Sequence, residues 1–166
     1  DSELELAPGR YLMPASPLAK LVQAAELQKT DSVLEIGAAT GYATAILSQL
    51  AGSVVALESE PSLLEALRAN VAGLSNVTVA EGDLKAGHAA NGPYDFIFIN
   101  GSVDEVPEAL FAQLKEGGRL ITVIGEGLAA GARIFVREHG IQSERFLFNA
   151  YVKHLPGFER TPEFVF

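Results

Sequence analysis

Short apolar runs alternate with helical patterns along most of the chain. Runs rich in Val, Ile, Leu and Phe predict five buried strands, at Ser32–Ala38, Ser53–Glu58, Val77–Ala80, Tyr94–Ile99 and Arg119–Ile124. Apolar residues that repeat on one helical face predict helices at Pro17–Gln28, Tyr42–Leu50, Pro61–Leu74 and Pro107–Leu114. Strands and helices that alternate through short connections form right-handed βαβ units, so the pattern predicts an α/β fold with a parallel sheet.

The last part of the chain has a different pattern. Ala132–Glu138 and Ser143–Val152 read as two strands joined by a short turn at His139-Gly140, which predicts an antiparallel hairpin at the sheet edge. The tail that follows, LPGFERTPEFVF, contains two prolines and three phenylalanines. We expect it to be an extended segment that packs through its aromatic rings.

Length and composition favour one globular domain over residues 1–166, with 48% apolar and 20% charged residues. The chain contains no cysteine, which excludes a disulfide scaffold, a cysteine-ligated metal and a cysteine nucleophile. Its three histidines, His88, His139 and His154, are scattered and show no metal-ligand spacing. We therefore expect no metal site.

The net charge of −9 and the absence of a basic stripe make nucleic acid a poor candidate partner. No apolar run reaches the length of a membrane span, and no signal peptide is visible at the N-terminus. We expect a cytoplasmic protein. Because the sequence lacks an initiator methionine, we also expect residues to be missing before Asp1.

A glycine-rich turn follows the first predicted strand, where parallel sheets bind ligands. It reads Gly37-Ala-Ala-Thr-Gly41, which is not the G-x-G-x-x-G fingerprint of dinucleotide sites. The turn therefore favours a nucleoside cofactor without a pyrophosphate over NAD. A plain strand–helix turn without a ligand is the structural alternative.

Three acidic residues near this turn favour a cofactor. Glu58 ends the second strand, 21 residues after Gly37, where an acid is placed to accept hydrogen bonds from ribose hydroxyls. Asp83 follows the third strand and is placed to accept from an exocyclic amine. Glu35 lies inside an apolar strand and needs a partner, either the amides of the turn or a cationic group of the cofactor. The alternative for each is an ordinary surface or capping carboxylate.

These residues resemble the methyltransferases that use S-adenosylmethionine (SAM), and most closely the protein-L-isoaspartate O-methyltransferase family. The family pattern LEIGxGxGYxTAxL appears here as LEIGAATGYATAIL, from Leu34 to Leu47. A second pattern, PxxLxxQLxEGGxL, appears from Pro107 to Leu120, and the C-terminal VRFVPL is echoed by Val152–Pro156.

The resemblance implies a Rossmann-like fold with about seven strands, helices on both faces of a twisted sheet, and the C-terminal hairpin. It implies that residues 1–16 form the substrate side and that SAM is the cofactor. It implies a protein, peptide or small-molecule acceptor, while the oligomeric state stays open. The implied cofactor-binding residues are Glu35, Gly37, Ala38, Ala39, Thr40, Gly41, Tyr42, Glu58, Ser59, Gly82, Asp83 and Asn100.

Two departures from the family pattern bear on function. Ala39 replaces the middle glycine of the turn, which narrows the loop without necessarily blocking a cofactor. Met13 aligns with the hydroxyl residue that contacts the substrate carboxylate in the family, and a thioether cannot donate a hydrogen bond. Ser16, three residues on, can replace that hydroxyl only if the loop runs differently.

Methyl transfer to a carboxylate needs no general base, because the acceptor is already anionic at pH 7. The site then needs hydrogen-bond donors that orient the acceptor, and Asn100, Gly101 and Ser102 are candidates, although Asn-Gly-Ser is also a typical turn. The leading hypothesis is methyl transfer to a carboxylate of damaged protein. The alternatives are a SAM-dependent methyltransferase with another acceptor, a SAM-binding protein with little catalysis and, least favoured, an NAD-dependent oxidoreductase.

Overall fold

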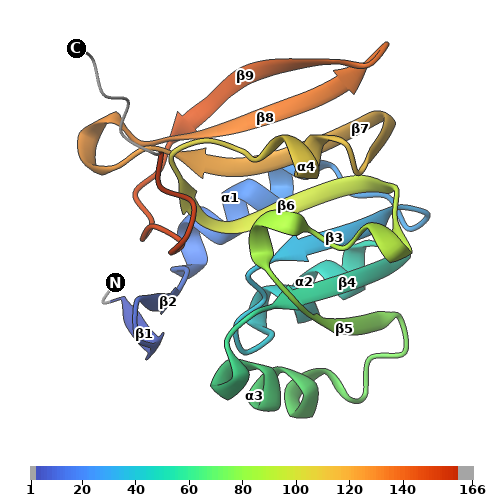
Figure 1. The fold of residues 1–166 in the computed structure, drawn as a ribbon, viewed down its shortest axis with the longest axis vertical. Coiled ribbons are helices and arrows are strands. Elements are labelled where there is room, and N and C mark those ends of the chain that lie inside the picture. Colours follow the sequence, from blue (N-terminus) through green and yellow to red (C-terminus); the bar gives the residue numbers. More distant parts are fainter. Residues whose placement is uncertain (1–2, 161–166) are drawn as a thin grey trace.

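The computed structural model describes residues 3–160, which form one large sheet with helices and a small separate hairpin (Figure 1). The strands of the large sheet are β3 (Ser32–Ile36), β4 (Ser53–Glu58), β5 (Val77–Glu81), β6 (Tyr94–Val103), β7 (Leu114–Ile124), β8 (Gly131–Glu138) and β9 (Ile141–Asn149). The helices are α1 (Ala15–Ala25), α2 (Tyr42–Leu50), α3 (Pro61–Val71) and α4 (Glu108–Phe111), with 3-10 turns at Leu84–Ala86, Ala89–Asn91 and Gly127–Ala129. The hairpin consists of β1 (Leu4–Ala7) and β2 (Arg10–Leu12).

The sheet has the strand order β5-β4-β3-β6-β7-β8-β9. The five strands from β5 to β7 are parallel, while β8 and β9 run antiparallel at the edge. The chain order reverses between β3 and β6, where the Gly37 turn follows β3. This confirms the predicted α/β class, the seven strands and the C-terminal hairpin. The carboxyl ends of the parallel strands meet along the edge where ligands bind in such sheets.

Apolar side chains pack on both faces of the sheet. Helices α1, α2 and α3 cover one face, where Leu21 and Leu47 are fully buried against β-strand residues such as Phe96. The short α4 and the segment after β9 cover the other face, through Leu110 and Phe158. Figure 1 shows α4 in front of the sheet and α1 behind it. Successive strand residues point to opposite faces, so strands covered on both sides are apolar throughout.

Several predicted boundaries were wrong because contacts distant in sequence decide them. The fourth strand was predicted to end at Ile99, with a turn as one alternative for Asn100–Ser102, but β6 continues to Val103, and the Ser102 N–H donates to the Lys153 carbonyl at 3.0 Å. The predicted helix Pro107–Leu114 ends at Phe111, because Leu114 already pairs with Tyr94 as the start of β7. Helix α1 begins at Ala15 and ends at Ala25, where Glu26 takes a left-handed conformation.

Both ends of the described chain lie across the large sheet's ligand-binding edge. The pattern analysis predicted no strand before residue 32, yet β1 and β2 form a two-stranded sheet of their own. The segment after β9 contains no helix or strand within the described residues, and the tail predicted to be extended turns at Pro156-Gly157. It buries Phe158, whereas Phe164 and Phe166 lie outside the described residues. The predicted organisation as one domain over residues 1–166 stays a prediction. The longest helices in residues 3–160 have 11 residues, and none is long and apolar enough to cross a membrane.

Gly41 is the point where the turn after β3 enters α2. Its φ of 96° is left-handed, and a Cβ there would lie 3.0 Å from Val71 Cγ1 and 3.1 Å from Leu67 Cδ1. A side chain at this position would therefore meet both backbone strain and the buried face of α3.

We expect Gly41→Ala to lower the free energy of unfolding by about 1–3 kcal/mol, measured by urea denaturation. Gly73→Ala is the matched control, because Gly73 has no left-handed φ and no atom within 4 Å of the added Cβ. Equal stability of the two variants would contradict this account of the turn.

Candidate functional site

The glycine-rich turn, which connects β3 to α2, is hydrogen-bonded to the carboxyl end of β4. The N–H groups of Gly37 and Ala38 both donate to the Leu57 carbonyl, at 3.0 and 3.1 Å. Gly37, Ala39 and Gly41 have positive φ angles of 82°, 54° and 96°. Alanine at a left-handed position costs roughly 1–2 kcal/mol, so Ala39 holds a conformation that the glycine it replaces would adopt freely.

Glu58, at the end of β4, is completely buried and paired with Arg10 from β2. The two guanidinium nitrogens donate to the two carboxylate oxygens, at 2.7 and 2.6 Å. The backbone N–H groups of Ala39, Ser59 and Glu60 donate to the same carboxylate, at 2.7, 2.7 and 3.0 Å. Burial by itself raises the pKa of Glu58, but these hydrogen bonds and the Arg10 charge outweigh it and leave the pKa lowered.

Glu35, in the middle of β3, is also completely buried but has no cation beside it. Its carboxylate accepts hydrogen bonds from the Thr44 hydroxyl and from the Asn100 amide, the latter at 3.1 Å. Burial raises the pKa of Glu35 to about 7, against the lowering effect of these two hydrogen bonds. The amide of the turn that was a candidate partner for Glu35, Ala39 N–H, donates to Glu58 instead.

The strand β2 crosses the sheet edge, and two small hollows lie beside it. One has a volume of about 20 Å³ and the other about 10 Å³, and Tyr11, Met13 and Asn100 line both. Each has room for about one water molecule, whereas small-molecule sites usually measure roughly 300–1,000 Å³. The sheet edge is thus closed over by the chain itself.

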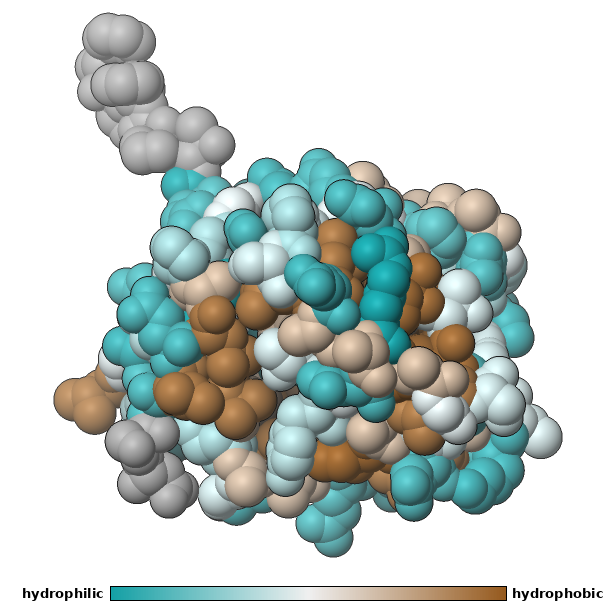
Figure 2. Space-filling view, turned by 90° about the horizontal axis from the view of Figure 1, so that it is seen from below, coloured by the Kyte–Doolittle hydropathy of each residue, from teal (hydrophilic) through white to brown (hydrophobic). Residues whose placement is uncertain are grey.

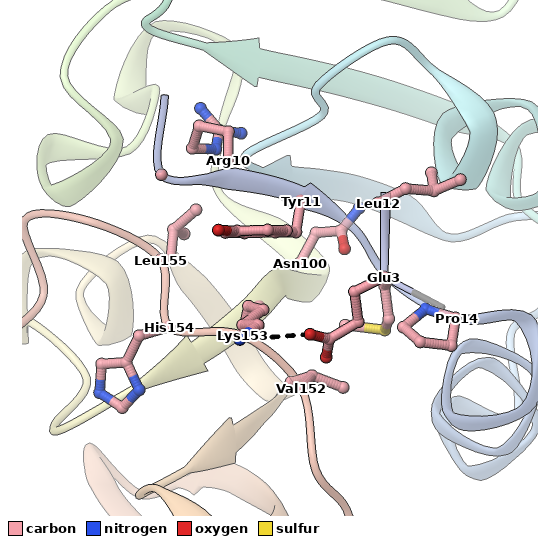
Figure 3. A pocket seen from close by; sticks show the side chains of 13 residues that line it. Glu3, Arg10, Tyr11, Leu12, Pro14, Asn100, Val152, Lys153, His154 and Leu155 are labelled. Atoms are coloured by element: carbon pink, nitrogen blue, oxygen red, sulfur yellow. Dashed lines mark ion pairs between the residues drawn. The ribbon is translucent and has the colours of Figure 1, made fainter. Parts of the chain in front are cut away.

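The larger hollow lies between β2 and the segment after β9 (Figure 3). Its labelled side chains include Tyr11, Lys153 and Leu155. The Lys153 ammonium pairs with Glu3 at 3.3 Å and lies 5.3 Å from the centre of the Tyr11 ring. Seen from below, the molecular surface carries hydrophobic side chains in several patches with hydrophilic residues between them (Figure 2).

Comparison with known proteins assigns the chain to a family. The model of the family described as Protein-L-isoaspartate(D-aspartate) O-methyltransferase (PCMT) matches residues 1–152. The chain belongs to the PCMT family. A protein-L-isoaspartate O-methyltransferase of Rhodopseudomonas palustris is 37% identical over 150 residues, which cover 84% of this chain and 69% of that protein. One from Ignicoccus hospitalis is 37% identical over 131 residues, 76% of this chain and 62% of that protein.

Solved PCMT structures share the fold. One named protein-L-isoaspartate O-methyltransferase has a TM-score of 0.80 at 33% identity and covers 89% of this chain but half of its own. A Plasmodium falciparum protein, provisionally named as a member and described in complex with S-adenosyl-L-homocysteine, has a TM-score of 0.75. The match covers 93% of this chain and 80% of the Plasmodium chain. Because the two are only 19% identical, the match shows a shared fold and no more. The chain spans about three fifths to two thirds of the length of most of the curated PCMT relatives that it matches.

Most of the cofactor-binding residues predicted from the PCMT resemblance lie at one edge of the sheet. The Gly37–Tyr42 turn, Glu58-Ser59 and Gly82-Asp83 follow the adjacent strands β3, β4 and β5, and Glu58 pairs in register with Glu81. Asp83 is exposed, and its carboxylate accepts the Lys85 N–H at 3.1 Å at the start of a 3-10 turn. The roles of these residues in binding stay predictions.

The three candidates for contact with the acceptor lie in different surroundings. Asn100 lines both hollows and donates to Glu35. Ser102 is completely buried and its hydroxyl donates to the Gly125 carbonyl, so it faces no acceptor in this conformation. Ser16 is exposed in the first turn of α1 and lines neither hollow. Met13 is 6% exposed and packs in the core with Leu18, which makes it a packing residue.

Sequence patterns do not predict a place at this edge for four residues: Arg10, Tyr11, Lys153 and Leu155. They come from the two segments for which apolar periodicity gives no information.

The raised pKa of Glu35 gives a stability profile with a defined sign. Between the ordinary pKa of 4.5 and the folded value of about 7, the folded protein binds more protons than the unfolded chain. Stability therefore falls as pH rises through this range. We expect the wild type to lose about 3 kcal/mol relative to Glu35→Gln between pH 5 and pH 8, measured by denaturant unfolding at each pH.

The exposed α3 residue Glu65 provides the control, because Glu65→Gln is expected to follow the wild-type profile. Parallel pH profiles for wild type and Glu35→Gln would show that the buried carboxyl does not take up a proton in this range.

Proposed function

We propose that this chain transfers a methyl group from SAM to a carboxylate of damaged protein, the isoaspartyl side chain being the acceptor. The observation that carries the proposal is the PCMT family match over residues 1–152, which includes the Gly37 turn, β2 and the end of β4. The names of the similar Rhodopseudomonas and Ignicoccus proteins support the same reaction.

The residues at the sheet edge fit SAM in kind. Glu58 would accept hydrogen bonds from the ribose hydroxyls, Asp83 from the exocyclic amine, and the positive-φ turn at Gly37 would let the cofactor approach the backbone. The match to the PCMT family supports this choice of cofactor. In the present conformation, however, Arg10 takes both oxygens of Glu58, and the hollows beside β2 are too small for a nucleoside.

Bound SAM supplies an electrophilic methyl group on a sulfonium, so the protein only has to hold donor and acceptor in line. The acceptor carboxylate is anionic at pH 7 and needs no general base. Lys153 offers a half-exposed cation beside the larger hollow. We propose that this side chain orients the acceptor.

A second candidate function keeps SAM and changes the acceptor. It is favoured by Met13, because the position that carries the carboxylate-binding hydroxyl in the resembling family is filled here by a core packing residue. A protein that binds SAM with little catalysis is the remaining alternative. Both alternatives predict that the chain binds SAM, as the first candidate does. They differ from the first candidate because neither predicts methylation of an isoaspartyl peptide.

The decisive measurement is transfer of labelled methyl from SAM to a peptide that contains isoaspartate, compared with the same peptide containing aspartate. We expect base-labile label, the behaviour of a carboxyl methyl ester, on the isoaspartyl peptide alone. Lys153→Gln should raise KM for the peptide severalfold, because it removes the cation beside the acceptor, with a smaller effect on kcat. Lys115→Gln, which alters a surface ion pair with Asp95, is the matched control.

Methylation of neither peptide by a protein that binds S-adenosyl-L-homocysteine would reject the isoaspartyl acceptor and favour the second candidate. Failure to bind S-adenosyl-L-homocysteine at all would reject the methyltransferase proposal.

A further inference from the structure

The ribose-binding carboxylate of the proposed site is fully occupied by the protein itself. Glu58 receives five N–H donors, two from Arg10 and three from the backbone. A carboxylate offers about four lone-pair positions, so none is left for a ribose hydroxyl. Within residues 3–160 no buried side-chain polar atom lacks a hydrogen-bond partner, so no buried side chain in this conformation is left unpaired for a ligand.

The backbone of the turn is covered as well. A Cβ placed on Gly37 would lie 3.3 Å from Leu155 Cδ1 and 3.4 Å from Arg10 Nη2. The space that a glycine opens for a ligand is therefore filled by two side chains of this chain. Arg10 blocks both the turn and Glu58, which makes it the common obstacle.

The element that carries Arg10 is only loosely built into the fold. Strands β1 and β2, the N-terminal strap of residues 4–12, pair with each other and not with the seven-stranded sheet. An isolated two-stranded hairpin is marginally stable in water. The ion pairs from the hairpin region to the rest of residues 3–160 are Arg10–Glu58 and the half-exposed Glu3–Lys153 pair next to the strap, and Lys153 also lies over the Tyr11 ring.

The segment that carries Leu155 is held more firmly. The Leu155 N–H donates to the Ser102 carbonyl at 2.8 Å, and the Ser102 N–H donates to the Lys153 carbonyl at 3.0 Å. This segment thus pairs with β6 through backbone hydrogen bonds, and its residues Leu155 and Phe158 are buried in the core. The site can therefore open more easily by movement of the strap than by movement of the segment that carries Leu155.

We propose that the N-terminal strap is an autoinhibitory element, in which Arg10 competes with the cofactor's ribose for Glu58. This inference rests on the proposed use of SAM. The closed conformation keeps Arg10 on Glu58, and cofactor binding requires the pair to break and the strap to move away from the turn. The affinity for the cofactor is then reduced by the fraction of molecules that are closed.

The test is the affinity for S-adenosyl-L-homocysteine, measured by calorimetry without any turnover. We expect Arg10→Ala to bind at least tenfold more tightly than the wild type, because no ion pair has to be broken. Arg10→Lys, which keeps the charge but cannot bind in the same bidentate way, should lie between the two. Arg133→Ala, which removes a cation from an exposed pair with Glu144, should match the wild type.

A second measurement keeps Arg10 in place, in case its removal prevents folding. Because the chain has no cysteine, Leu4→Cys introduces the only thiol, at a side chain that is 58% exposed on the strap. A spin label there should gain mobility when S-adenosyl-L-homocysteine saturates the protein. The same label at Ile141→Cys, 70% exposed at the start of β9, should not change.

The outcomes separate the strap from the proposed function. If the labelled Leu4→Cys protein binds S-adenosyl-L-homocysteine and its label does not gain mobility, the autoinhibitory role of the strap is wrong and the SAM site stands. Unchanged or weaker binding by Arg10→Ala than by the wild type has the same meaning. No binding by the wild type and by a folded Arg10→Ala overturns the cofactor site and the strap together.

Discussion

A buried ion pair between Arg10 of β2 and Glu58 at the carboxyl end of β4 organises the ligand-binding edge proposed for this molecule. Glu58 lies at the end of β4 with no exposed surface, and burying a lone carboxylate there would be very costly. The Arg10 guanidinium, with two short hydrogen bonds, supplies the missing positive charge. The path of the chain before α1 and the covering of the Gly37 turn both follow from this pairing. Removal of either partner leaves the other charge buried and unpaired.

The contrast between the two buried carboxylates shows what this pairing does. Glu35 and Glu58 lie on neighbouring strands, and each has no exposed surface. Burial alone raises the pKa of both, and for Glu35, which has two neutral donors, it prevails. For Glu58 the hydrogen bonds from Arg10 and the backbone reverse it. The negative charge of Glu58 in turn adds to the raised pKa of Glu35, so the two sites are electrostatically linked.

Local sequence pattern accounts for most of the fold and for half of the site. Strands such as Ser53–Glu58 and the helix Tyr42–Leu50 were predicted with correct bounds, because apolar periodicity is a local property. The positions of the Gly37 turn and Glu58 at one edge follow from parallel topology. The predicted strand Tyr94–Ile99 is too short because the strand conformation of Asn100–Ser102 depends on Lys153 and Leu155, about 50 residues away. Arg10 lies 48 residues from Glu58, and no periodicity links them.

The two covering segments show why the remaining half of the site escaped prediction. A residue that packs against its own element leaves a periodic trace, whereas Arg10 and Leu155 act on a turn that neither adjoins in sequence. Their effect is combined: the charge of Arg10 satisfies Glu58, and the apolar side chain of Leu155 excludes water from the same turn, which strengthens the ion pair. Neutral ribose hydroxyls can donate hydrogen bonds to this carboxylate but cannot replace the positive charge. A ligand that takes the place of Arg10 at Glu58 must therefore either bring a cation close to this carboxylate or let water back in beside it.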